Sequence, residues 1–316
     1  MKTIELRSDT CTLPTGEMRA AMAEAELGND GFGEDPTVNA LEEKAAVMLG
    51  KEAAVFVASG IMGNLLAFLS HGTEGSEVIL EDDHHSLTNE YGGVSTFAGR
   101  IPRSAPGQNG RVPLETVRRL IREPGSTVST GLICLENTHN NAGGLCLPHE
   151  YIMDVCALAH SKGIPVHMDG ARIFNAGIAT GVPVKDLCSP VDSVMFCLSK
   201  GLGCPVGSIL AGDKPFIKTV RHNRKRLGGQ MRQAGVLAAA GMVALDRMIE
   251  RLRDDHDNAR ALAAALLKFP ELGIDAAKVQ TNIVLLELNG SRHGKAKELG
   301  AALKARNIMV NVSGSS

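Results

Sequence analysis

The feature that most constrains the fold is the alternation of two kinds of segment between Lys51 and Gly212. Short apolar runs rich in β-branched residues alternate with segments of helical periodicity, which is the pattern of parallel α/β units. The strands expected from it are AAVFVAS (53–59), SEVILED (76–82), TGLICLEN (130–137), GIPVHMD (163–169), DSVMFCL (192–198) and GSILAG (207–212). Helices are expected over 41–49, 112–122 and 150–162. A mostly parallel, doubly wound sheet follows, with its ligand at the carboxyl ends of the strands.

The composition of the sequence changes after Gln233. An Ala- and Leu-rich stretch predicts a long helix over 234–268, with a length that allows a bend, and Pro270 ends it. A strand (279–288), a helix (295–306) and a short strand (308–312) then predict a small α/β domain, which we expect to be incomplete at its C-terminal end. The expected division is an N-terminal segment (1–14), a large domain (15–245) and this small domain (246–316).

The composition excludes several classes of protein. With 316 residues, 44% of them hydrophobic and 22% charged, the chain can form a large core and more than one domain. It has no apolar window long enough for a membrane span and no apolar core of a signal peptide, so the cytoplasm is expected. A net charge of -2 gives no footprint for nucleic acid, although RHNRKR (221–226) is a basic cluster. Seven scattered cysteines without a CxxC pair indicate reduced thiols.

Lys200 stands out in FCLSKGLGCPVGS (196–208), between two runs that are expected to be buried strands. Lysine is rarely buried without a partner, and the glycines around it permit close approach of a ligand to the backbone. One interpretation is a surface lysine in a glycine-rich turn. The other is an amine that forms a Schiff base with a carbonyl group.

Asp169 ends an expected strand in VHMDGARIF, and Arg172 follows three residues later. A carboxylate at a strand end could bind a metal, a ribose or a protonated ring nitrogen, or merely cap the next helix. His167 lies two residues earlier on the same face of the strand, which keeps a metal site open as an alternative.

Three further turns carry candidate residues. The turn Ser59-Gly60-Ile61 leads from a strand into an apolar helix, whose free N–H groups and dipole suit a phosphate. EDDHHSLTNEYGG places His84 and His85 after two aspartates, either as metal ligands or as a cap or ring-stacking group. His139 follows another strand and could be structural or catalytic. A phosphate turn, a stacking histidine, an acid for a ring nitrogen and a Schiff-base lysine together are what pyridoxal phosphate (PLP) requires.

The sequence also resembles a known family, the low-specificity L-threonine aldolases of the β-eliminating lyase group. The matching stretches occur in order along nearly the whole chain: LRSDTCTLPTGEMRAAM, GFGEDPTVNALEEKAA, SGIMGNLLAFLSHG, ICLENTHNNAGG, VHMDGARIFNA, FCLSKGLGCPVGS and LGGQMRQAGVLAAAG. The resemblance implies the aspartate aminotransferase fold (fold type I): a large domain with a mostly parallel seven-stranded sheet, and a small α/β domain. It also implies a PLP-dependent enzyme that acts on a small amino acid, with no nucleic acid or membrane as partner.

The resemblance assigns roles to individual residues. Lys200 matches the lysine that forms the Schiff base with PLP, and Asp169 matches the partner of its ring nitrogen. Ser59, Gly60 and Ile61 match the phosphate turn. Lys225 and Arg232 match basic residues that reach the phosphate from a neighbouring subunit, which implies at least a dimer in a family that is usually tetrameric. His85 matches the histidine that stacks on the ring and His139 a second active-site histidine; Ser8 and Arg172 match groups that bind the substrate carboxylate. No metal is implied.

The expected reaction is retro-aldol cleavage of L-threonine or L-allo-threonine to glycine and an aldehyde, with His85, His139 or a water that they hold as the base. The sequence departs from the family pattern at Ile61, Phe32 and Asn89, and it stops before a second carboxylate-binding arginine. The alternatives are therefore another PLP reaction (cleavage of bulkier β-hydroxy amino acids, β-elimination or racemisation) or an inactive PLP-binding protein. A metal-dependent hydrolase that uses His84, His85, His167 and Asp169 is a third hypothesis.

Overall fold

The computed structural model describes residues 3–123, 125–290 and 294–312. Its helices are α1 Gly16–Glu24, α2 Pro36–Leu49, α3 Gly60–Ser70, α4 His85–Thr88, α5 Gly93–Thr96, α6 Leu114–Leu120, α7 His149–His160, α8 Ile173–Thr180, α9 Val184–Cys188, α10 Lys214–Arg226, α11 Gly235–Arg247, α12 Leu252–Leu266 and α13 Ala296–Lys304. Short 3₁₀ helices cover Asp9–Cys11, Asp30–Phe32 and Ala276–Lys278.

The strands are β1 Ile4–Leu6, β2 Ala53–Val57, β3 Glu77–Glu81, β4 Ile101–Ala105, β5 Thr130–Glu136, β6 Val166–Asp169, β7 Ser193–Cys197, β8 Ser208–Gly212, β9 Leu272–Gly273, β10 Glu287–Leu288 and β11 Ile308–Val310. In the described part of the chain, the central sheet has seven strands in the order β2-β8-β7-β6-β5-β3-β4. Only β8 runs against its neighbours, so the mostly parallel α/β sheet predicted from the sequence is confirmed.

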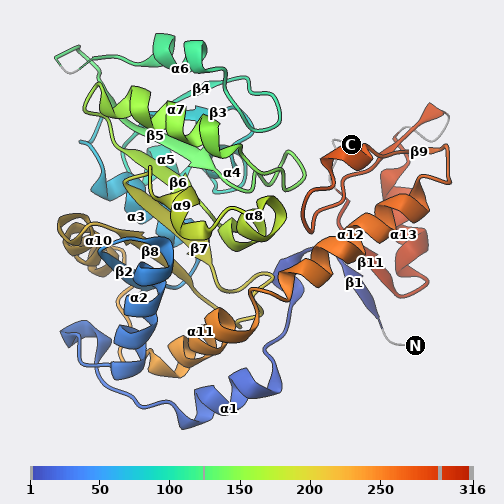
Figure 1. Cartoon of the computed structure of the whole chain (residues 1–316), viewed down its shortest axis with the longest axis horizontal. Coiled ribbons are helices and arrows are strands. Elements are labelled where there is room, and N and C mark those ends of the chain that lie inside the picture. Colours follow the sequence, from blue (N-terminus) through green and yellow to red (C-terminus); the bar gives the residue numbers. More distant parts are fainter. Residues whose placement is uncertain (1–2, 124, 291–293, 313–316) are drawn as a thin grey trace.

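Helices cover both faces of this sheet (Figure 1). On one face α3 and α10 pack against β2, β7 and β8 around Leu66, Met195 and Val220. On the other face the largest core cluster includes residues of α2, α7 and α11, such as Leu41, Val155 and Ala240. The strands are therefore buried on both sides, which explains why they appear in the sequence as nearly continuous apolar runs.

Edge strand β4 has no counterpart among the strands expected from the sequence. Its residues, IPRSA, include a proline and are mostly exposed. Because a sheet edge tolerates proline and polar side chains, this strand has no apolar run that a sequence pattern could reveal. It pairs in parallel with β3.

The C-terminal part follows expectation in one place and differs in another. The long helix expected over 234–268 is bent, as its length allowed: it consists of α11 and α12, and the residues between them form i→i+3 hydrogen bonds from Ile249 to Asp254. The strand expected over 279–288 is reduced to β10. The preceding residues instead contact the large sheet domain: Gln280 accepts a hydrogen bond from the N–H of Cys146, and Thr281 donates one to the carbonyl of Gly144.

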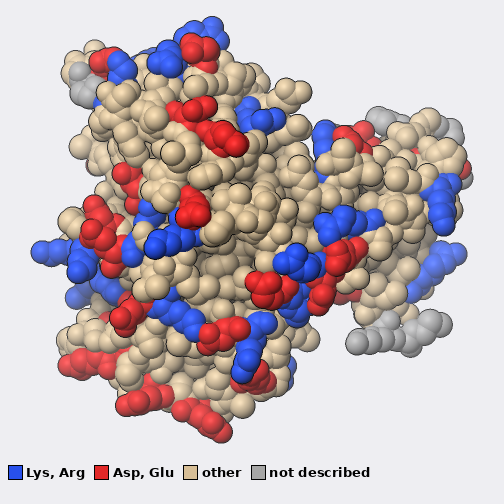
Figure 2. Space-filling view, in the orientation of Figure 1, with Lys and Arg blue, Asp and Glu red and all other residues tan. Residues whose placement is uncertain are grey.

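The N-terminal segment joins the C-terminal part. Strand β1 pairs in parallel with β11, so the first and last strands of the described chain lie side by side (Figure 1). On the face shown in Figure 2, acidic and basic side chains are interspersed, as the dispersed charge of the sequence predicts. Each helix within the described residues is too short or too polar to span a bilayer.

Candidate active site

The fold brings five predicted segments to one edge of the sheet. Strands β2, β3, β5, β6 and β7 run in the same direction. Their carboxyl ends lead to Ser59, His85, His139, Asp169 and Lys200, respectively. These residues, which are far apart in the sequence, thus lie along the edge where α/β sheets bind their ligands.

Lys200 lies in the loop between β7 and β8 and is partly buried. Its carbonyl accepts hydrogen bonds from Thr12 Oγ1 (2.7 Å) and from the N–H of Gly203 (2.9 Å). Gly203 and Gly207 have φ of 78° and 107°, and a Cβ at Gly207 would meet the ring of Phe56. These two glycines therefore serve the turn and its packing, whereas the sequence suggested that they make room for a ligand.

Asp169 is the last residue of β6, and its carboxylate is buried, with 2% of the residue exposed. Asn64 Nδ2 donates a hydrogen bond to Oδ2 (2.7 Å), and the N–H of Ala171 donates one to Oδ1 (3.1 Å). Burial acts to raise the pKa of Asp169, but the charges of His84, His85 and Lys200 and the bond from Asn64 outweigh it and lower that pKa. An ionised acid in this position suits a protonated ring nitrogen.

His85 lies beside Asp169 at the start of α4. Its Nδ1 is 2.8 Å from Glu90 Oε1, and its backbone N–H donates to Glu136 Oε2 (2.8 Å). Burial acts to lower the pKa of His85, but the bond to Glu90 and the charges of Asp169, Glu90 and Glu136 raise it overall. Among the described residues the structure records no partner for Nε2 of His85, so this atom can exchange a proton with a substrate.

His139 is placed differently. It is 1% exposed; its Nε2 lies 3.1 Å from Glu81 Oε2, and its Nδ1 accepts a hydrogen bond from the N–H of Ala142 (3.2 Å). Both ring nitrogens are thus engaged by the protein. Of the two histidines predicted as candidate bases, His85 is the one with a ring nitrogen available.

Arg172 forms a buried ion pair with Asp9, a residue that no local sequence pattern marks. Its Nε donates to Asp9 Oδ2 (2.6 Å) and its Nη2 to Oδ1 (2.8 Å), while Nη1 donates to Asn140 Oδ1 (3.0 Å). Asn282 also donates to Asp9 (3.0 Å). The predicted substrate ligand Ser8 is exposed, and its Oγ accepts from the N–H of Thr10.

The N-terminus of α3 fits a phosphate group. Ser59 caps the helix by accepting from the N–H of Met62 (3.2 Å), and the structure records no acceptor among the described residues for the N–H groups of Gly60 and Ile61. A Cβ at Gly60 would lie 2.7 Å from Cys197 Sγ, so only glycine packs there. Lys225 and Arg232, which the resemblance predicts to reach a neighbouring subunit, are exposed.

The four residues of the metal hypothesis do not gather around one point. His84 Nδ1 accepts from the N–H of Ser86, and His167 lies between Ser193 and Asn64. Within the described residues, the set that could hold a metal is His85, Glu90 and Asp169, whose ligand atoms lie within 4.8 Å of one another. Asn64 Nδ2 donates to both carboxylates of this set, so a hydrogen-bond donor already occupies the space between them.

Comparison with known proteins decides the family. Residues 5–289 match the family model described as "Beta-eliminating lyase". The chain belongs to the β-eliminating lyase family. The resemblance to low-specificity L-threonine aldolases is also confirmed: the Arabidopsis thaliana protein "Low-specificity L-threonine aldolase 1" is 46% identical over 315 residues, which cover 98% of this chain and 88% of the relative. An Escherichia coli O157:H7 "Low specificity L-threonine aldolase" is 43% identical over 312 residues, or 98% and 91% of the two chains.

Solved structures share the fold at lower identity. A threonine aldolase from Leishmania major has a TM-score of 0.76 and 18% identity, and the match covers 86% of this chain and 81% of that one. A serine palmitoyltransferase from Sphingomonas wittichii also has a TM-score of 0.76, with 19% identity over 98% and 78% of the two chains. Their likeness to this chain confirms the predicted α/β fold class.

Proposed function

We propose that this lyase uses PLP to cleave β-hydroxy-α-amino acids, L-threonine or L-allo-threonine, to glycine and an aldehyde. One observation carries the proposal: Lys200, Asp169 and His85 meet at the carboxyl edge of the sheet in a chain 46% identical to a low-specificity L-threonine aldolase. The three residue types are those that PLP chemistry requires, and their common location at this edge supports the proposal.

The residues of this site fit PLP. When bound, PLP supplies a carbonyl carbon for the substrate amine and a ring that takes up the electrons of the broken Cα–Cβ bond. Lys200 would hold the cofactor covalently and the ionised Asp169 would keep its ring nitrogen protonated. The N–H groups of Gly60 and Ile61, at the positive end of the α3 dipole, would bind the phosphate.

His85 is the base in this proposal. Its Nδ1 contacts Glu90 at 2.8 Å, which leaves Nε2 as the atom that takes the proton of the β-hydroxyl group. A positioned group of this kind accelerates proton transfer by typically ~10² to 10⁴. The buried His139 would contribute by holding the neighbouring loop rather than by accepting this proton.

Arg172 is proposed to bind the substrate carboxylate together with Ser8. A guanidinium group has five N–H donors. Asp9 and Asn140 accept from Nε, Nη1 and Nη2, one N–H each, so the second N–H of Nη1 and of Nη2 remains for a substrate. The ion pair with Asp9 thereby fixes the orientation of the group that receives the substrate.

We further propose a homo-oligomer, at least a dimer and, as is usual in the family, a tetramer, in which Lys225 and Arg232 bind the phosphate of the neighbouring subunit. The exposure of both residues supports this arrangement. The cytoplasmic location expected from the sequence stays a prediction.

The deciding experiment measures glycine and acetaldehyde made from L-threonine and from L-allo-threonine by the purified protein with added PLP. Lys200→Ala should abolish turnover and, at the same time, the visible absorbance of bound cofactor. Lys218→Ala, at an exposed position of α10, is the matched control and should retain both. Glycine production by the Lys200→Ala protein at the rate of the control would reject the assignment.

The same assay separates related activities. Phenylserine tests cleavage of bulkier β-hydroxy amino acids, and serine tests β-elimination through the release of pyruvate. Release of acetaldehyde from threonine with no pyruvate from serine is the outcome expected of an aldolase.

A further inference from the structure

Asn64 is the last residue of the SGIMGN stretch, and the proposed function gives it no role. It lies on the side of helix α3 that faces the sheet, and most other side chains of this helix are apolar. Its amide is 1% exposed and is fully bonded. Nδ2 donates to Asp169 Oδ2 (2.7 Å) and to Glu90 Oε1 (2.9 Å), and Oδ1 lies 3.3 Å from His167 Nε2.

The orientation of this amide is fixed by its neighbours. Carboxylates only accept hydrogen bonds, so the NH₂ group must face Asp169 and Glu90, and the carbonyl oxygen must face His167. His167 then carries its proton on Nε2. Burial lowers the pKa of His167 to about 3, so the ring is neutral and its Nδ1 accepts from Ser193 Oγ, 2.8 Å away.

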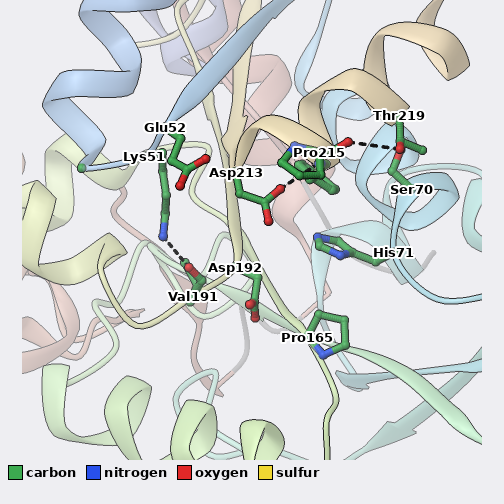
Figure 3. A pocket seen from close by; sticks show the side chains of 12 residues that line it. Lys51, Glu52, Ser70, His71, Pro165, Val191, Asp192, Asp213, Pro215 and Thr219 are labelled. Atoms are coloured by element: carbon green, nitrogen blue, oxygen red, sulfur yellow. Dashed lines mark hydrogen bonds between the residues drawn. The ribbon is translucent and has the colours of Figure 1, made fainter.

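The chain of hydrogen bonds continues along α3. Ser193 Oγ donates to His167 and therefore accepts from His71 Nε2, 2.7 Å away. Burial lowers the pKa of His71 to about 4, so this ring is also neutral. His71 borders a groove of about 570 Å³ (Figure 3). This groove lies at the end of the sheet opposite the carboxyl ends of β2, β6 and β7. From His71 at the groove to the carboxylates of Asp169 and Glu90, each hydrogen bond therefore has one defined direction of donation.

We propose that Asn64 is a positioning residue that holds the carboxylates of Asp169 and Glu90 side by side by donating one N–H to each. Two carboxylates this close disfavour each other's charged form unless donors lie between them. Through Asp169 the amide acts on the cofactor nitrogen, and through Glu90 it acts on His85 Nδ1. This inference rests on the proposed use of PLP.

The test is the dissociation constant of PLP, measured between pH 6 and pH 8 by cofactor absorbance, together with the thermal unfolding of each protein without cofactor. Asn64→Asp keeps the shape but replaces the donor with a third carboxylate, so one of the three must take up a proton. We expect PLP to bind roughly tenfold more weakly or worse at pH 8, with a smaller loss at pH 6. A loss from structural damage alone would not depend on pH in this way.

Matched variants complete the design. Asn223→Asp makes the same change in a buried residue of α10 that bonds to Ser70, and it should leave PLP binding unchanged. Glu90→Gln introduced into the Asn64→Asp protein removes one of the three charges and should recover part of the affinity. Asn64→Leu removes both donors without adding charge and should also weaken binding, which keeps the proposal testable if the aspartate variant does not fold.

Two outcomes would overturn the inference: PLP binding by Asn64→Asp or Asn64→Leu equal to that of the unsubstituted protein, or a loss in Asn64→Asp that is the same at pH 6 and pH 8. These outcomes differ from a failure of the proposed function. If the unsubstituted protein does not bind PLP, the proposed function is rejected and this inference with it.

Discussion

At the scale of single residues, the ion pair of Asp9 and Arg172 joins three parts of the chain. Asp9 comes from the N-terminal segment, Arg172 follows β6, and Asn282, which also donates to Asp9, precedes β10. Both side chains of the pair are 7% exposed. Burial acts to raise the pKa of Asp9, but the charge and hydrogen bonds of Arg172 outweigh it and lower that pKa. A charge that is buried to this extent destabilises the fold unless an opposite charge lies beside it.

Asp9→Asn should therefore destabilise the protein. Removing one partner of a buried pair leaves the other charge uncompensated and costs about 3 to 5 kcal/mol. We expect a decrease of this size in the free energy of unfolding, measured by urea denaturation at pH 7. The control is Glu115→Gln, which breaks an exposed pair with Arg118 and should change stability by less than about 1 kcal/mol.

The sign of the pH dependence provides a second check on the same variant. Because the pKa of Asp9 is lower in the folded state, its contribution is present above the ordinary pKa of an aspartate and is lost as the pH falls through the folded pKa. The difference between the unsubstituted protein and Asp9→Asn should thus shrink at strongly acidic pH. A difference that grows on acidification would contradict the assigned ion pair.

At the scale of elements, helix α3 shows what a sequence pattern conceals. GIMGNLLAFLS appears in the sequence as a buried apolar helix, and most of it is one. Its buried polar residue Asn64 faces β6, where it meets His167, and the following His71 meets Ser193 of β7, whereas Ser70 contacts α10. Strand residues alternate between faces, so His167 and Asp169 point to the same side. These contacts depend on the register of helix against sheet, which no local pattern specifies.

The two neutral histidines at this contact, His71 at the end of α3 and His167 of β6, should make the protein sensitive to acid. The pKa of His71 is lowered to about 4 and that of His167 to about 3, while an unfolded histidine titrates near 6.5. Between those values the unfolded state binds more protons, so stability falls as the pH falls, by up to about 1.4 kcal/mol per pH unit for each histidine.

Urea denaturation at pH 7, 6 and 5 measures this slope. His71→Asn should reduce the slope between pH 6 and pH 5 by up to about 1.4 kcal/mol per pH unit. His222→Asn, at an exposed position of α10, should leave the slope unchanged. Equal slopes for His71→Asn and the unsubstituted protein would show that His71 is not held neutral in the fold.

At the scale of the whole molecule, the sequence predicts the features that arise from repeated or local patterns of residues. The strands with apolar runs, the sheet class and the segments that carry Lys200, Asp169 and His85 follow from patterns within a few residues. The pairing of β1 with β11 joins positions at opposite ends of the chain, and Asp9 meets Arg172 and Asn282 across a similar separation. Such contacts are set by how complete elements pack, so the sequence predicts a strand over 308–312 but not its partner β1, and no local pattern marks Asp9 or Asn282.

The proposed oligomer can be tested by subunit mixing. If Arg232 binds the phosphate in the neighbouring subunit, each site combines Lys200 of one chain with Arg232 of the other. Lys200→Ala should be inactive, and Arg232→Ala should bind PLP weakly because a charge-assisted contact with the phosphate is lost. Each homo-oligomer then has defects in all of its sites.

Mixed oligomers should regain activity. In a hybrid dimer of the two variants, one site pairs the intact Lys200 with the intact Arg232, while the other site carries both substitutions. Random reassociation of equal amounts into two-fold symmetric dimers therefore restores about a quarter of the sites. We expect threonine cleavage at limiting PLP to recover toward that fraction after the two variants are dissociated together and reassembled. Mixing without dissociation is the control. Activity that never exceeds the sum of the separate proteins would show that Arg232 does not complete its neighbour's site.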